Sequence, residues 1–160
     1  MRMIATQDKE KTSAEPIRDM TAVLNRQIAN WNILYTKLHR FHWFVKGPQF
    51  FTLHSKFEQL YEEAATYIDE LAERVLAIGG RPLATMREYL AEASVKEAEG
   101  DHTGTEMAAM IVKDFETVIS ELKSGLKTAR QAQDEPTSDI LIGMQKSLEK
   151  HVWMLKAFNG

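Results

Sequence analysis

Hydrophobic residues recur at alternating intervals of three and four along most of this chain, the pattern of helices that bury one face. We expect the first such helix to begin at Pro16 and to end at Lys46-Gly47-Pro48. Its core-facing positions are Leu24, Ile28, Trp31, Tyr35, Leu38, His42 and Val45. Residues 1–15 lack the pattern, so we expect a flexible tail followed by a single domain of residues 16–160.

Three further long helices follow from the same pattern. The second starts between Phe50 and Thr52 and ends at Gly79-Gly80, and the third runs from Thr105 to about Gln133. The fourth follows Pro136, with Thr137 or Ser138 as its cap. Its core-facing positions are Ile140, Met144, Leu148 and Trp153.

The connection between the second and third helices is long and contains one short helical piece, Met86 to Ala93. A long link is needed when the second and third helices of a bundle run parallel. We therefore expect an all-α fold, a ferritin-like four-helix bundle with a short extra helix in this connection.

The composition of the chain restricts the kinds of site and partner that it can have. The chain has 160 residues, 44% of them hydrophobic, which fits one soluble domain. A net charge of −3 and a pI near 6.0 give no overall affinity for nucleic acid or acidic membranes. Cysteine is absent, so disulfides and thiolate sites are excluded, and imidazole and carboxylate remain as metal ligands. No secretory or membrane-spanning segment is recognisable, and we expect a cytoplasmic protein.

Two histidines and three carboxylates are the candidate metal ligands. They are spaced at intervals of 12, 4, 11 and 4, and are His42, His54, Glu58, Asp69 and Glu73. The last four lie close to one face of the second helix, because intervals of 4 and 11 nearly complete whole turns. Glu58 and Asp69 nevertheless lie about 16 Å apart along the helix axis, so no single ion reaches both pairs in one chain. A second, identical chain related by a two-fold axis would bring opposite pairs together.

Simpler explanations exist for each residue taken alone. His42 fits a hydrogen-bonded core histidine, and the three carboxylates fit a solvated helix face. Together, however, the candidates on the second helix flank its core stripe, with Tyr61, Ala65 and Ala72 between them. That mixture is typical of a contact surface, where buried carboxylates favour a bound cation. The chain lacks the paired Glu-x-x-His motifs of a single-chain di-iron bundle.

Several of these segments resemble the Dps family, the ferritin-like miniferritins of bacteria. The matching segments are Leu38-His39-Arg40-Phe41-His42-Trp43, Val45-Lys46-Gly47-Pro48, Phe51-Thr52-Leu53-His54 and Ile68-Asp69-Glu70-Leu71-Ala72-Glu73-Arg74. The resemblance implies ligands His42, His54 and Glu58 from one subunit, with Asp69 and Glu73 from its two-fold mate. The family more often has aspartate where this chain has Glu58.

The resemblance also implies a function. It predicts a ferroxidase that binds two iron ions at each site between subunits, with zinc or manganese as substitutes. Hydrogen peroxide would be the preferred oxidant for Fe(II), and ferric mineral would be stored inside a twelve-subunit shell. Such a protein stores iron and limits Fenton damage under oxidative stress.

Further residues have candidate roles beside this site. Trp43 is a possible electron donor or an interface aromatic, and Asp134, Glu135 and Asp139 form either an acidic pore for iron or a solvated loop. Glu62 and Glu63 are possible nucleation residues for mineral, or ordinary surface glutamates.

DNA binding, which the family name implies, has little support in this sequence. The tail has Arg2, Lys9 and Lys11 against Asp8, Glu10 and Glu15, so its side-chain charges sum to zero. Two alternatives to the ferroxidase remain. One is a nucleoid-associated, DNA-compacting structural protein, which would retard DNA without iron. The other is a plain four-helix scaffold, which would be small and would not bind iron.

Overall fold

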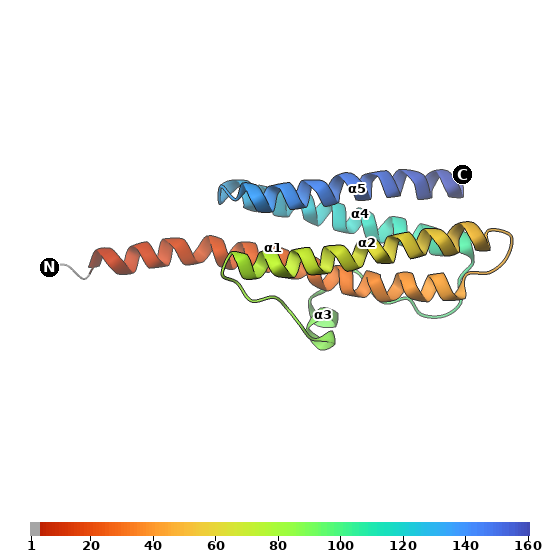
Figure 1. Ribbon diagram of the computed structural model, residues 1–160, viewed down its shortest axis with the longest axis horizontal. Helices are drawn as coiled ribbons and strands as arrows, with labels where there is room; N and C mark the ends of the chain where they lie inside the picture. The colour runs from red at the N-terminus through yellow and green to blue at the C-terminus, as the bar shows by residue number, and fades with distance from the viewer. Residues whose placement is uncertain (1–3) are drawn as a thin grey trace.

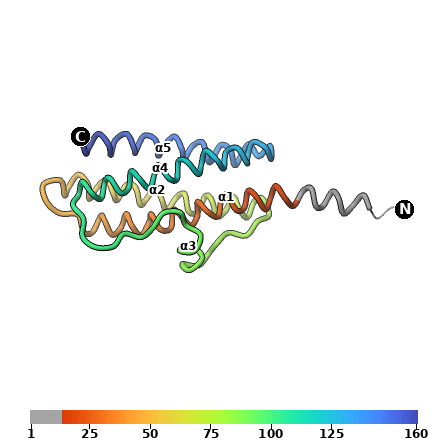
Figure 2. The backbone as a smooth tube through the Cα atoms, turned by 180° about the vertical axis from the view of Figure 1, so that it is seen from behind, coloured from red at the N-terminus to blue at the C-terminus, as the bar shows by residue number. Residues whose placement is uncertain are grey.

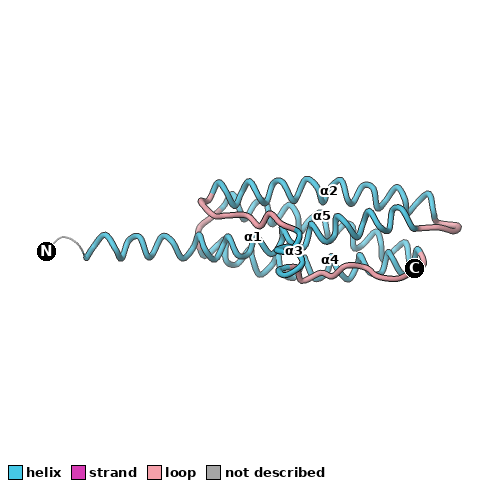
Figure 3. Tube along the Cα trace, turned by 90° about the horizontal axis from the view of Figure 1, so that it is seen from below, coloured by secondary structure: helices cyan, strands magenta, loops and turns pink. Residues whose placement is uncertain are grey.

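The computed structural model describes the backbone of residues 4–160 and the side chains of residues 14–160. Four long helices and one short helix make up the fold (Figure 1). They are α1 (Ile4–Phe44), α2 (Phe50–Ala77), α3 (Met86–Glu92), α4 (Gly104–Gln131) and α5 (Glu135–Asn159). Loops join these helices, and no strand occurs in residues 4–160 (Figure 3). The predicted all-α bundle with a short helix in its long connection is confirmed.

The helices form two antiparallel pairs, α1 with α2 and α4 with α5 (Figure 1). Because α4 runs in the same direction as α2, the chain must return along the bundle before α4 begins. The connection that does this carries α3 and contacts α1 (Figure 2). Across residues 4–160, no helix has the length and apolar character needed to cross a membrane.

Hydrogen bonds hold the long connection against the bundle. The carboxylate of Glu121 on α4 accepts hydrogen bonds from Gln27 and Asn30 of α1, at 2.8 Å and 2.7 Å, and from the Ser94 hydroxyl. The Asn30 side-chain oxygen accepts the backbone N–H of Ser94 at 2.8 Å. The connection is therefore fixed to both helix pairs.

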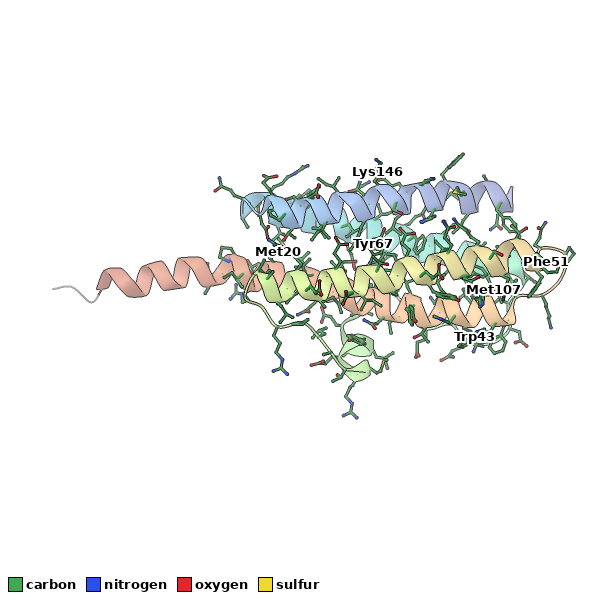
Figure 4. The ribbon with its side chains drawn as sticks, viewed as in Figure 1. Met20, Trp43, Phe51, Tyr67, Met107 and Lys146 are labelled. Atoms are coloured by element: carbon green, nitrogen blue, oxygen red, sulfur yellow. The ribbon has the colours of Figure 1, made fainter. Side chains whose placement is uncertain are left out.

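Aromatic residues join the two helix pairs in the core. The ring of Trp31 on α1 lies 4.8 Å from that of Tyr67 on α2 and 5.9 Å from that of Phe115 on α4. Tyr67 lies in the interior, between the two helix pairs (Figure 4). Offset and tilted ring pairs of this kind contribute about 0.5–1.5 kcal/mol beyond the burial of their area.

Two aromatic residues assigned to core stripes are exposed. Tyr35 is 37% exposed and Trp153 is 67% exposed. On α5 the core stripe continues from Leu148 through His151 to Leu155, all three buried. Trp153 lies five residues after Leu148, which turns it about 140° away from that stripe.

Two helix starts differ from the sequence predictions. Helix α1 begins at Ile4 and includes Pro16, because a helix can continue past a proline at the loss of one backbone hydrogen bond. The side chains of residues 1–13 lie outside the described residues, so the flexibility expected of the tail remains a prediction. Helix α5 is capped by Asp134, whose side chain accepts the backbone N–H of Thr137, and Pro136 fits its first turn.

Asp134 also ties the α4–α5 turn to α2. Its carboxylate accepts a hydrogen bond from the guanidinium of Arg74 at 2.8 Å, and Arg74 donates a second to the Thr137 hydroxyl at 2.8 Å. Burial alone would raise the pKa of Asp134, but the bonds from Thr137 and Arg74 outweigh it and lower the pKa.

Replacing Asp134 by alanine should therefore lower the free energy of unfolding by about 1–2 kcal/mol, since a helix cap and an ion pair are lost together. Urea unfolding at pH 7 and fixed protein concentration measures the change. Asp139→Ala removes the same charge from an exposed position on α5 and should stay within about 0.5 kcal/mol of the parent. Equal losses in the two variants would contradict the capping role.

Candidate metal centre

The turn between α1 and α2 brings the two candidate histidines together. His42 lies near the end of α1 and His54 in the second turn of α2. The intervening loop includes Gly47 with φ of +96°, a conformation that favours glycine. The imidazole rings of His42 and His54 stack with centroids 3.7 Å apart and planes 17° apart.

Each imidazole forms a hydrogen bond with the backbone of the other histidine. Nδ1 of His42 lies 2.8 Å from the carbonyl oxygen of His54, and Nδ1 of His54 lies 2.8 Å from that of His42. A carbonyl oxygen can only accept, so both Nδ1 atoms must donate. In the neutral form of each ring, this bond selects the tautomer that leaves the Nε2 lone pair for a metal ion.

Glu58 adds a carboxylate one turn after His54 on α2. Its side chain is exposed, and its Oε1 atom accepts a hydrogen bond from the Tyr61 hydroxyl at 3.4 Å. Desolvation, followed by the negative charge of Glu58, raises the pKa of Tyr61, so the hydroxyl retains the proton that it donates. Two candidate nitrogen ligands and one candidate oxygen ligand thus come from one end of the helix pair.

The other two candidates lie farther along α2. Asp69 and Glu73 are both exposed, and the helix rise separates Asp69 from Glu58 by about 16 Å. Among residues 14–160 of a single chain, no three His, Cys, Asp or Glu side chains meet closely enough to hold a metal ion. One chain therefore presents two separate groups of candidate ligands, one where α1 and α2 meet and one farther along α2.

Trp43 lies beside His42 but points outward. It is 66% exposed, on the side of α1 away from α4 and α5 (Figure 4). Its ring centroid lies 5.4 Å from that of His39. Both an interface contact and electron donation near the site remain predictions for it.

Glu62 and Glu63 occupy different environments. Glu62 is exposed, whereas the Glu63 carboxylate turns inward and accepts hydrogen bonds from Tyr67, Ser147 and, at 2.6 Å, His151 Nε2. Burial works to raise the pKa of Glu63, but these three hydrogen bonds outweigh it and lower the pKa to about 2. Of the two predicted nucleation residues, Glu62 is exposed, whereas the carboxylate of Glu63 is engaged by three hydrogen bonds within the chain.

His151 completes this buried network and was not singled out from the sequence. Its Nδ1 atom accepts a hydrogen bond from the Lys56 amine at 3.1 Å, while its Nε2–H donates to Glu63. The sequence did contain a signal, because His151 lies three residues after Leu148 and four before Leu155, on the core stripe.

The three acidic residues of the predicted pore are also not equivalent. The Asp134 carboxylate is engaged by Arg74 and Thr137, while Glu135 and Asp139 are exposed in the first turns of α5. If a pore forms here, Glu135 and Asp139 are the residues available to line it.

Known proteins of similar sequence and structure place the chain in a family. A family model described as a ferritin-like domain matches residues 21–160. DNA protection during starvation protein 2 of Bacillus anthracis is 57% identical over 141 residues, covering 88% of this chain and 97% of that protein.

Comparison with solved structures gives the same family. A Dps protein from Bacillus brevis superposes with a TM-score of 0.90 at 53% identity, covering 91% of this chain and 98% of that chain. A variant of Listeria innocua Dps superposes with a TM-score of 0.86 at 40% identity, covering 88% and 95% of the two chains. In this variant one histidine is replaced by glycine, and in a second solved variant another histidine is replaced in the same way. The two replaced positions are 12 residues apart, which is also the interval between His42 and His54 in this chain. The chain belongs to the Dps family of ferritin-like proteins.

Proposed function

We propose that the protein detoxifies and stores iron by oxidising Fe(II) to Fe(III) at sites shared between two copies of the chain. The observation that carries this proposal is the pair of reciprocal Nδ1 hydrogen bonds, which prepare His42 and His54 to bind a metal through Nε2. Membership of a family whose relatives are named for protection during starvation supports it. Iron is the substrate, and zinc and manganese are substitutes with similar ligand preferences.

Each site would combine ligands from two subunits. His42, His54 and Glu58 of one chain would face Asp69 and Glu73 of its two-fold mate. Two observations support this arrangement. The two sets lie too far apart along α2 to share an ion within one chain, and neither set alone provides enough ligands for two ions. Six such dimers would form the proposed shell of twelve, with ferric mineral inside.

Hydrogen peroxide is the proposed oxidant. Two Fe(II) ions each lose one electron, the peroxide O–O bond breaks, and two protons complete two water molecules. Because both electrons are delivered within one site, no hydroxyl radical is released. The chain contributes ligand geometry and negative charge, which compensates the cations. Glu135 and Asp139 would admit iron, and Glu62 would nucleate mineral.

Protection of DNA does not require contact with it in this proposal. Removal of Fe(II) together with peroxide prevents the damaging reaction, and the balanced charge of the tail provides few phosphate contacts.

Anaerobic Fe(II) titration of the assembled protein tests the proposal. We expect two Fe(II) bound per chain, then consumption of one peroxide for every two Fe(II) oxidised. Light scattering should give a particle of about twelve times the 18.3 kDa chain mass. A monomer that binds no Fe(II), or peroxide consumption independent of iron, would refute it.

A further inference from the structure

The Tyr61 side chain lies between two of the candidate ligands. Its hydroxyl donates to Glu58 Oε1 at 3.4 Å, from a position three residues later on the same face of α2. Its ring meets the His42 imidazole edge to face, with centroids 5.3 Å apart and planes 89° apart. One side chain thus contacts a ligand from α1 and a ligand from α2.

Neighbouring rings hold Tyr61 in this position. His39 stacks on it with centroids 3.8 Å apart and planes 17° apart. His39 is itself fixed, because its Nδ1 atom bonds the carbonyl oxygen of Tyr35 at 2.8 Å. The Tyr35 ring stands edge-on to Tyr61 at 6.2 Å. Tyr61 therefore packs against two aromatic neighbours, neither of which belongs to the proposed ligand set.

The carboxylate of Glu58 needs such support. It is exposed, and a glutamate has three rotatable side-chain bonds, so it would otherwise sample many positions. Histidine ligands already have backbone partners that orient them, whereas the Tyr61 hydroxyl is the side-chain partner that the structure gives Glu58. Partners that orient ligands typically contribute 10–100-fold to metal affinity.

We propose that Tyr61, packed against His39 and Tyr35, is a positioning residue that orients the Glu58 carboxylate for divalent metal binding. This inference rests on the proposed function, because it assumes that Glu58 binds metal. It assigns Tyr61 no redox or proton-transfer step.

Cobalt(II) binding by the assembled wild-type protein and its variants tests the proposal without reference to oxidation activity. Calorimetry gives the affinity, and the visible absorption of cobalt reports its ligand geometry. Tyr61→Phe should weaken binding about tenfold and alter the absorption spectrum. Tyr35→Phe is the matched control, because within residues 14–160 the structure shows no hydrogen bond from the Tyr35 hydroxyl, and binding should not change.

A second background shows whether Tyr61 acts through Glu58. Glu58→Asp withdraws the carboxylate by one carbon–carbon bond, about 1.5 Å, from the hydroxyl. Adding Tyr61→Phe to that variant should cost less than about twofold in affinity. Wild-type affinity in Tyr61→Phe, or the same loss in both backgrounds, would overturn the inference.

His54→Ala separates this inference from the proposed function. If His54→Ala loses cobalt and Tyr61→Phe does not, only the positioning role fails. If His54→Ala binds cobalt as the wild-type protein does, the proposed site itself fails.

Discussion

Replacing His42 by alanine and Asp69 by asparagine in the same chain should reduce the initial rate of peroxide-dependent Fe(II) oxidation by more than about 100-fold. Loss of a residue that only orients a ligand costs 10–100-fold, and removal of ligands from both halves of the site should cost more. Stopped-flow absorbance of ferric product measures the rate. Asp101→Asn with His102→Ala makes the same chemical changes in the connection before α4 and should retain the wild-type rate. A double variant with an unchanged initial rate would remove His42 and Asp69 from the site.

Mixed assemblies of two inactive variants extend this prediction. One variant carries His42→Ala and His54→Ala, and the other carries Asp69→Asn and Glu73→Gln. If each site takes one ligand set from each chain, a mixed dimer has one fully damaged site and one intact site. With random pairing about half of the dimers are mixed, and one of the two sites in each mixed dimer is intact. About a quarter of all sites should therefore be active.

Co-expression with two different affinity tags isolates the mixed particles for the same assay. If all the ligands of a site came from one chain, mixing would restore nothing. Activity in the mixture but in neither parent would therefore establish that the two ligand sets act in different subunits.

Acidification should destabilise the protein through Glu63. The pKa of this carboxyl is about 2 in the folded chain, below its ordinary value of 4.5. Because the folded-state pKa is depressed, the contribution to stability is present above pH 4.5 and is lost as the pH falls toward 2. The side chain is 23% exposed, and after allowance for solvent screening we expect a loss on the order of 2 kcal/mol across this window.

Glu63→Gln tests the origin of that loss. At pH 7 the variant should be less stable by about 2–3 kcal/mol, because the hydrogen bonds from Tyr67, Ser147 and His151 lose their charged acceptor. The difference from wild type should shrink as the pH falls from 4.5 to 2. Urea unfolding at matched protein concentrations measures both curves.

Glu62→Gln provides the neighbouring control, since Glu62 is exposed, and it should follow the wild-type curve within about 0.5 kcal/mol. Parallel curves for wild type and Glu63→Gln down to pH 2 would mean that this carboxylate does not contribute to the acid dependence.

The local pattern of hydrophobic residues was sufficient to predict most of the helices. The start of α2 at Phe50 and the short helix at Met86 follow from breaks in a periodic stripe, and both agree with the structure. The start of α5 was placed too late, because Asp134 was taken as part of an interruption. Its role as a cap depends on the backbone of Thr137 and on Arg74 of a distant helix.

Glu63 shows where local pattern fails. Beside Glu62 it looks like a second surface carboxylate, because both lie outside the core stripe. Its main partner, His151, lies 88 residues away on α5, and the environment of a side chain depends on such distant packing. Trp153 was misplaced for a related reason, since one position along a helix rotates a side chain by about 100°.

The sequence by itself determined the number and order of the helices, the family resemblance, and a spacing of candidate ligands that cannot form one site within a single chain. These properties depend on residue spacing, and the helix converts spacing directly into position. Only the tertiary structure decided that His42 and His54 fix each other's tautomers, that Tyr61 contacts both Glu58 and His42, and that Glu63 bonds His151. These contacts join helices whose relative placement results from packing of the whole core, and residue spacing along one helix carries no information about it.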